Sequence, residues 1–349
     1  MSFQEEKRNS IKRYMLEKIR KDDVEYLQKT TYNFQISNTT VKRYIRECLE
    51  QQILIEDDSA ACGYRLKKQE YRYEYAAEDG LDEDDIYYRD IALLLEDISE
   101  DAKRIWRYTF MEMMNNAIEH SQCKRIYCRI VKDALYTEIT ITDDGIGIFK
   151  NVQNYLATVL GKKATCQDAL TELYKGKMTT ASENHSGEGI FFSSKAMDEF
   201  AIWSDNTVYV QGVQERTQFV QNHLIAYYTR LARIGTQVMM KLGNQTKRSL
   251  REVFNMYSTI DDGFVKTLVP IKEVCQEGEP IARSQARKIL YRLEQFKVVE
   301  FDFAEVEFMG QGFADAVCRV FQTRYPEIEI IPLNAGPDIM RMIKHVQRA

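Results

Sequence analysis

Residues 110–121 read FMEMMNNAIEHS, and residues 141–149 read ITDDGIGIF. In the first stretch Glu112 and Asn116 stand four residues apart, so on a helix both side chains project from one face. In the second, the apolar and polar alternation typical of a strand ends at Asp143. Gly145 and Gly147 follow, and because glycine has no side chain, a ligand can approach the backbone closely there. Taken singly, a polar helix stripe and an Asp-Gly turn have ordinary structural explanations.

Two later stretches extend the pattern. Residues 185–198 read HSGEGIFFSSKAMD, with Gly187 and Gly189 just before a predicted helix. The free N–H groups and the dipole at a helix N-terminus favour phosphate. Residues 234–242 read IGTQVMMKL, so Gly235 and Thr236 open a predicted strand. The order of the four pieces along the chain is more informative than any one of them.

In that order the pieces resemble the N, G1, G2 and G3 boxes of the GHKL (HATPase_c) ATPase superfamily, which includes gyrase, Hsp90, histidine kinases and MutL. The resemblance covers residues 91–244 and implies a Bergerat α/β sandwich that binds ATP and Mg²⁺. It implies that Asp143 accepts a hydrogen bond from the adenine amino group, which discriminates adenine because another base would leave the carboxylate unpaired. Asn116 would give Mg²⁺ a side-chain oxygen, and Glu112 would polarise the attacking water.

The same resemblance assigns further contacts. Thr236 would hydrogen-bond near the adenine, and the triphosphate would be admitted by glycines, namely Gly145, Gly147, Gly187 and Gly189. Residues 150–186 would form a flexible lid over the nucleotide. Three side chains in it are candidates to reach the phosphates, with simple solvation as the alternative: Lys175, Lys177 and His185. Phe191 stands where histidine kinases commonly have a third glycine, which favours another branch of the superfamily.

Residues 1–70 predict a winged helix-turn-helix. Apolar residues recur at helical spacing in three segments, with Asn38 or Thr39 as the expected N-cap of the third, and residues 53–66 read as a small β-hairpin. The third helix presents polar and basic residues suited to DNA contacts, namely Thr39, Thr40, Lys42, Arg43 and Arg46. Glu47 and Glu50 share that helix, so a protein-interaction module is the alternative. Residues 71–90, rich in tyrosine and acidic residues, are interpreted as a linker, or as a strand followed by a solvated loop.

After a second predicted linker, residues 245–262, strands and helices alternate over residues 263–349 and predict a separate α/β domain. Its central stretch, residues 298–321, reads VVEFDFAEVEFMGQGFADAVCRVF. This resembles the STAS-like DUF4325 domains and, more distantly, the anti-anti-sigma factors. Gly310-Gln311-Gly312 has no hydroxyl where phosphorylated members have a serine, so we expect an interaction surface or a structural domain without a phosphorylation switch.

The composition sets limits on these assignments. A net charge of −5 over 349 residues gives no global attraction to nucleic acid, so DNA contacts need a local basic patch. The 7 cysteines include no C-x-x-C pair, which indicates a reducing compartment rather than a disulfide framework or a zinc ribbon. No segment has the roughly 18–20 consecutive apolar residues of a membrane span, and the polar, charged N-terminus shows no apolar h-region. We therefore expect a cytoplasmic protein without membrane contacts.

Taken together, the sequence predicts a multidomain α+β and α/β protein: a winged helix, a GHKL ATPase domain and a STAS-like domain. The leading hypothesis is a bacterial regulator and slow ATPase whose nucleotide state controls binding to DNA through the winged helix, or to protein partners through the STAS-like domain. Two alternatives stay open: a serine/threonine protein kinase of the anti-sigma-factor type, and a module that binds ATP without turnover. Dimerisation is also open, since members of this superfamily often form homodimers.

Overall fold

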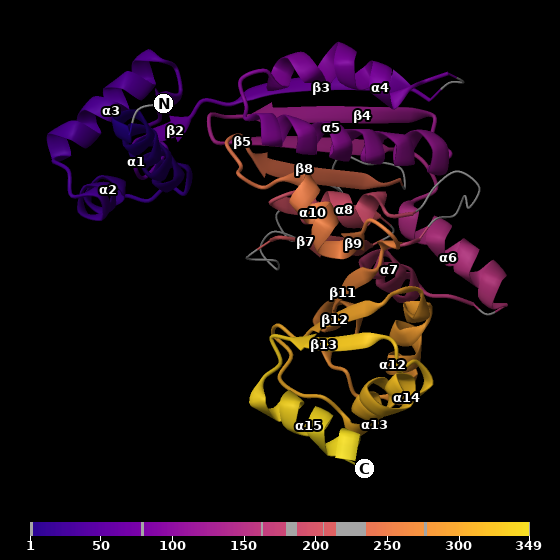
Figure 1. Cartoon of the computed structure of the whole chain (residues 1–349). Coiled ribbons are helices and arrows are strands. Elements are labelled where there is room, and N and C mark those ends of the chain that lie inside the picture. The colour runs from indigo at the N-terminus through magenta and orange to yellow at the C-terminus, as the bar shows by residue number, and fades with distance from the viewer. Residues whose placement is uncertain are drawn as a thin grey trace.

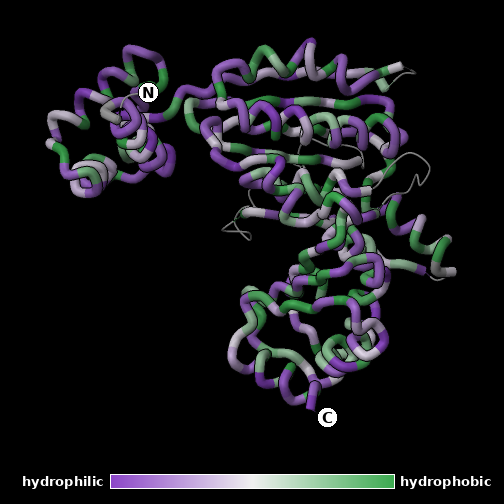
Figure 2. Tube along the Cα trace, in the orientation of Figure 1, coloured by the Kyte–Doolittle hydropathy of each residue, from purple (hydrophilic) through white to green (hydrophobic). Residues whose placement is uncertain are grey.

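The computed structural model describes residues 3–77, 80–161, 163–178, 187–204, 206–213, 235–275 and 278–348. It is a mixed α/β structure with four β-sheets in the described residues. Figure 1 shows three units along the chain: a helical N-terminal unit, a central unit built on the largest sheet, and a C-terminal unit below that sheet. Figure 2 shows hydrophilic and hydrophobic residues alternating along the helices and strands of these units, as elements with one buried face require.

The N-terminal unit consists of three helices followed by a two-stranded hairpin. Leu54 pairs with Leu66 across the hairpin, and both side chains are buried with the apolar faces of the helices. The third helix begins after Ser37, whose hydroxyl accepts a hydrogen bond from the Thr40 amide, so the expected cap at Asn38 or Thr39 is one or two residues late. The elements are α1 (Phe3–Arg20), α2 (Tyr26–Phe34), α3 (Asn38–Glu50), β1 (Leu54–Glu56) and β2 (Tyr64–Leu66).

The central sheet has six strands, all antiparallel, in the order β3-β4-β5-β8-β6-β7. Along β4 and β5 every second side chain is buried, which is the period of a strand with one face against a core. The strands are β3 (Gln69–Ala76), β4 (Arg125–Lys132), β5 (Tyr136–Asp143), β6 (Glu199–Ser204), β7 (Thr207–Gln211) and β8 (Gln237–Gly243).

Helices pack on the sheet and contribute the large apolar side chains of the core. Ser99 caps α5 by accepting from the Ala102 amide, and Trp106 and Phe110 of this helix are fully buried. A π-helical turn, η3 (Asn116–His120), continues α5. The remaining elements here are α4 (Glu83–Ile86), η1 (Tyr87–Ile91), η2 (Ala92–Leu95), α5 (Glu100–Asn115), α6 (Ile148–Leu160), α7 (Cys166–Lys175), α8 (Gly189–Ala196) and α10 (Leu250–Tyr257).

The C-terminal unit is a parallel sheet of three strands, in the order β11-β12-β13, with helices packed against it. Val299 and Phe301 of the middle strand are buried in a core continuous with that of the central unit. Its elements, with the short hairpin before them, are β9 (Ser258–Thr259), β10 (Gly263–Phe264), β11 (Lys266–Pro270), α11 (Ile271–Val274), α12 (Arg283–Leu290), η5 (Leu293–Gln295), β12 (Val298–Asp302), α13 (Gln311–Asp315), η6 (Ala316–Phe321), α14 (Gln322–Arg324), β13 (Glu329–Leu333) and α15 (Pro337–Arg348).

Three expected irregular segments contain regular structure instead. In residues 71–90, the alternating tyrosines form most of β3, which pairs with β4 over its whole length, so the expected strand is present. The helical elements α4 and η1, with Ile86 and Tyr87 buried, stand where a linker or a solvated loop was expected. In residues 245–262, α10 buries Val253 and Tyr257. The expected lid contains α6 and α7, because apolar residues at helical spacing, such as Val152 and Leu156, interrupt its polar sequence.

The N-terminal unit docks on the turn between β4 and β5. Leu135 of this turn is buried in the core of the N-terminal unit. The Tyr136 hydroxyl donates to Glu17 Oε1 at 2.7 Å, and the guanidinium of Arg20 lies 4.3 Å from the centre of the Tyr136 ring. The turn therefore fixes α1 against the end of the sheet at which β5 begins.

The junction with the C-terminal unit contains a buried ion pair. Lys175 Nζ donates to Glu172 Oε1 at 2.6 Å, and both side chains are almost completely buried. Nζ also donates to the Tyr291 carbonyl at 2.6 Å, while the Thr267 hydroxyl donates to the Lys175 carbonyl at 2.7 Å. α7 is thus bound to β11 and to the loop after α12.

Within the described residues, no helix has the length and apolarity needed to cross a membrane.

Replacing Lys175 with methionine should lower the free energy of unfolding by about 3–5 kcal/mol, because Glu172 would keep a buried charge without its nearest cation. Urea unfolding of the whole chain measures this. The matched control is Lys272→Met, which breaks a surface ion pair with Glu305 and should change stability by no more than about 0.5 kcal/mol. Equal stability of the Lys175 variant and the wild type would show that the pair does not stabilise the junction.

Candidate functional site

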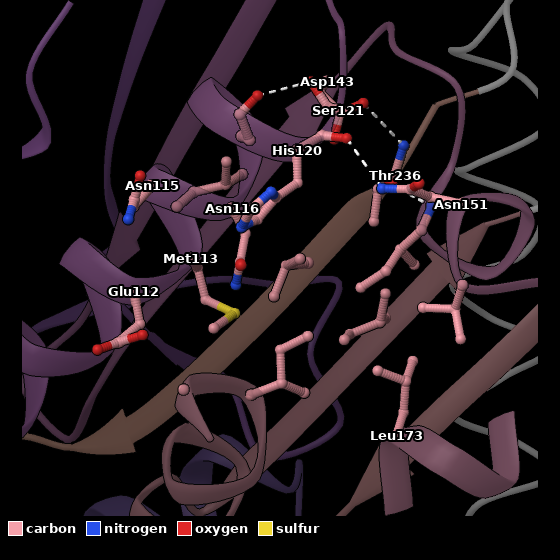
Figure 3. Close-up of a pocket in the computed structure, with 18 of the residues that line it drawn as sticks. Glu112, Met113, Asn115, Asn116, His120, Ser121, Asp143, Asn151, Leu173 and Thr236 are labelled. Carbon is pink, nitrogen blue, oxygen red and sulfur yellow. Dashed lines mark hydrogen bonds between the residues drawn. The ribbon is translucent and has the colours of Figure 1, made fainter. Parts of the chain in front are cut away.

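A cavity of about 300 Å³ lies between the core face of the sheet and the helices α5, α6 and α7. Its floor is apolar and comes from the strands, with Ile141 of β5, Ile202 of β6 and Val238 of β8. Polar groups gather at its rim, where β5 ends and β8 begins (Figure 3). A concave apolar site with a few convergent polar groups is typical of small-molecule binding.

Asp143 is the most constrained polar group of this cavity. The residue is 4% exposed, and its Oδ1 accepts the Gly145 amide at 2.9 Å and the Thr236 amide at 3.2 Å. Burial raises the pKa of Asp143 to about 6, although the two N–H donors act in the opposite direction. β8 pairs with β5 directly beside it, so the sheet register brings Thr236 to this carboxylate.

Glu112 and Asn116 line the opposite side of the cavity. They project from successive turns of the helix formed by α5 and η3, as their spacing predicts (Figure 3). The carboxylate of Glu112 lies against the start of α8: a Cβ added to Gly189 would stand 2.0 Å from Glu112 Oε2. Glycine at 189 therefore makes room for a carboxylate at the N-terminus of this helix.

The predicted glycines have different surroundings. Gly147, Gly187 and Gly189 line the cavity, and Gly147 and Gly187 have positive φ values of 85° and 69°. Gly145 is not among the lining residues; a Cβ there would lie 2.1 Å from the Ser121 carbonyl oxygen. The structure thus gives Gly145 a packing role beside the cavity, since no other residue fits so close to the backbone.

Thr236 holds the start of α6 as well as Asp143. Its hydroxyl oxygen accepts the Ile148 amide at 3.0 Å, and its carbonyl accepts the Asp143 amide at 2.9 Å. One threonine therefore joins the end of β5, the beginning of β8 and the first turn of α6.

The structure does not bring the predicted lysines to the cavity. Lys175 is committed to the junction described above, and burial lowers its pKa. Lys177 Nζ donates to the Gln295 carbonyl at 3.0 Å and lies 4.7 Å from the centre of the Phe296 ring. Lys175 ends α7 and Lys177 follows it, and both ammonium groups donate to carbonyls of the C-terminal unit, so the structure does not support them as phosphate contacts. His185 lies outside the described residues.

Sequence reasoning missed several side chains that line the cavity. His120 follows Asn116 by four residues on the same helix face, so the spacing of Glu112 and Asn116 already pointed to it. Asn115 also lines the cavity, but the motif marked only the adjacent Asn116. Asn151 lies in the segment expected to be the lid, and its side-chain amide donates to the His120 carbonyl at 3.2 Å. The apolar lining residues outside the quoted motifs are Val152, Leu173, Met178 and Ile202.

On the N-terminal unit, α3 exposes Thr39, Lys42, Arg43 and Arg46. The Thr40 hydroxyl instead lies 2.9 Å from Ser37 Oγ within the cap. Glu47 lies 3.8 Å from the Arg43 guanidinium and is held by Arg8 and Lys12 of α1 at 2.6 and 2.9 Å. Two of the predicted basic residues, Lys42 and Arg46, have no ion-pair partner within the described part of the chain.

Comparison with known families identifies one part of the chain. Residues 285–340 match the STAS-like domain of unknown function DUF4325. The match runs from α12 into α15 and confirms the predicted STAS-like domain at the C-terminus. No curated protein matches the chain. The parallel strand β11 precedes the matched residues yet pairs with β12, so it belongs to the same sheet.

The raised pKa of Asp143 predicts a pH dependence of stability. The native state binds the proton up to about pH 6, whereas the unfolded carboxyl releases it near its ordinary value of 3.8. The contribution of this group therefore favours folding at low pH and is lost as pH rises from about 4 to about 6. Thermal unfolding midpoints of the wild type and of Asp143→Asn, recorded across that window without added ligand, measure the contribution of this group. If the unfolding midpoints of the two proteins differ by the same amount at every pH in this window, the pKa of Asp143 is not raised.

Proposed function

We propose that this chain is a regulatory protein whose central unit binds ATP with Mg²⁺. The observation that supports it is the convergence of four motifs on one cavity. Glu112 and Asn116 of the first motif and Asp143 of the second line it, together with Gly147, Gly187, Gly189 and Thr236. This is the set that the resemblance to the GHKL superfamily assigns to the nucleotide.

The surroundings of Asp143 suit an adenine. The two backbone N–H groups fix one carboxylate oxygen, and the apolar strand residues beneath offer a flat surface for a base. An adenine amino group would donate to this carboxylate. A guanine would present a carbonyl oxygen at the equivalent ring position, which leaves the buried acceptor unpaired. The site therefore favours adenine nucleotides.

Glu112 and Asn116 fit the phosphate end of the nucleotide. An amide oxygen is a ligand that Mg²⁺ accepts, and phosphate oxygens and water would complete its octahedron. Bound there, the ion would offset the negative charge of the phosphates. Glu112, one helical turn earlier, would accept a proton from an attacking water. Its position against Gly189 places the carboxylate beside the helix start at which the phosphates would lie.

The N-terminal unit fits a winged helix that contacts DNA, with α3 as the recognition helix. The three helices and the β1–β2 hairpin have the required order, and exposed basic residues stand on α3. The C-terminal STAS-like domain would then engage a protein partner. In this proposal the nucleotide state of the central unit sets how the two flanking units bind.

Asp143→Ala should abolish detectable binding of Mg-ATP in titration calorimetry, because the adenine loses its acceptor. Glu112→Gln should keep binding and lower phosphate release by at least about 100-fold, the range of general-base catalysis. Asp261→Ala, which removes an exposed carboxylate, is the control. Unchanged affinity of the Asp143 variant would rule out the site. Transfer of labelled phosphate to a protein, rather than its release, would assign the chain to the kinases.

The double variant Lys42→Ala/Arg46→Ala should weaken DNA binding in gel shifts and reduce the dependence of the logarithm of affinity on the logarithm of salt concentration by about 2. The reason is that each side chain would neutralise one phosphate. Lys344→Ala, an exposed cation of α15, should leave both quantities unchanged. Identical salt dependence of the double variant and the wild type would favour a protein partner for this face.

A further inference from the structure

Arg292 of the C-terminal unit reaches the wall of the nucleotide cavity. We define this wall as residues 172–178, of which Leu173 and Met178 line the cavity. Arg292 Nη2 donates to the Lys177 carbonyl at 3.0 Å, and Nη1 lies 3.1 Å from Met178 Sδ. The same Nη1 is 3.6 Å from the buried Glu172 carboxylate. One planar guanidinium thus contacts both ends of the wall.

At the Met178 end, the wall is connected to the motif that contains Gly187 and Gly189. The Met178 amide donates to the Gly187 carbonyl at 3.1 Å, and Gly187 lines the cavity. Between these contacts, Gly176 has a φ of 74°, and a Cβ at this position would lie 2.7 Å from the Phe264 ring. The backbone of the wall therefore fits closely against the Phe264 ring, where only a glycine leaves enough room.

The geometry of Arg292 itself points to a specific role. Its backbone is left-handed, with φ of 63°, and its side chain is 23% exposed. A left-handed non-glycine residue is uncommon and needs support from its surroundings. Here the conformation begins η5 and directs the guanidinium back across the junction. Arg292 meets the carbonyl from Nη2 and the sulfur and carboxylate from Nη1, whereas a lysine would have to reach all three from a single nitrogen and has no such planar fork.

We propose that Arg292 is a positioning residue of the nucleotide site, contributed by the STAS-like domain. It holds the wall in the shape that receives the adenine nucleotide, and it does not itself touch the nucleotide. This inference rests on the proposed ATP function. Because coupling between two sites is reciprocal, a partner that moves η5 would change nucleotide affinity, and nucleotide binding would change the affinity for that partner by the same factor.

Arg292→Ala in the full chain should weaken Mg-ATP binding by roughly five- to fifty-fold in calorimetry, within the usual range of intramolecular coupling. Arg292→Lys should recover part of the affinity, since Nζ can still donate to the Lys177 carbonyl. Arg287→Ala removes an exposed arginine of the neighbouring α12 and should bind as the wild type does. Wild-type affinity of Arg292→Ala would overturn the proposal, as would equal loss in the alanine and lysine variants.

Amide hydrogen exchange without nucleotide separates this inference from the proposed function. The Met178 amide should exchange at least about 10-fold faster in Arg292→Ala than in the wild type, with Arg292→Lys between them. If the wild type and Arg287→Ala both fail to bind Mg-ATP, the proposed function falls, and exchange alone decides whether Arg292 holds the wall. Unchanged exchange at Met178 would show that it does not.

Discussion

The pairing of β5 with β8 is the constraint on which the site depends. Their register sets Thr142 opposite Gln237, so the next residue of β5 meets the residue that precedes β8. The Asp143 amide then donates to the Thr236 carbonyl, and the Thr236 amide donates to the buried Asp143 carboxylate, which also accepts the Gly145 amide. Gly235 fits beside it because a Cβ there would lie 1.9 Å from the Asp143 carbonyl oxygen. A shift of one residue in this register would turn the carboxylate to the other face of the sheet.

Residue patterns predicted the structure correctly where a single local rule determines it. The alternation in β4 and β5 and the helical spacing of Glu112 and Asn116 each follow from a fixed period, and the structure has both. Tertiary packing decided the rest. α7 buries a run of residues that includes Glu172 and Lys175, and no single-sequence rule distinguishes such a lysine from a solvated one. The difference lies in the carbonyls of Lys288 and Tyr291, which are more than 100 positions away in the chain.

Phe191, two residues after Gly189, packs against aromatic residues at the junction with the C-terminal unit. Its ring packs 4.6 Å from Phe264 and 4.9 Å from Tyr257, measured between ring centres. Phe192 lies 4.4 Å from Phe254. α8 therefore begins at the cavity and continues into an aromatic cluster at the junction with the C-terminal unit. With Arg292 on the neighbouring side, the glycine motif and the STAS-like domain share a continuous core.

The docking of the N-terminal unit has a consequence for how the chain can be divided. Leu135, a residue of the central unit, completes the core of the first three helices, and β3 begins three residues after β2 ends. Excising the first seventy residues would leave an apolar side chain in water and cut into the edge strand of the sheet. The N-terminal unit is therefore not an interchangeable cassette, and a chimaera that transplants it onto another protein needs the β4–β5 turn as part of the graft.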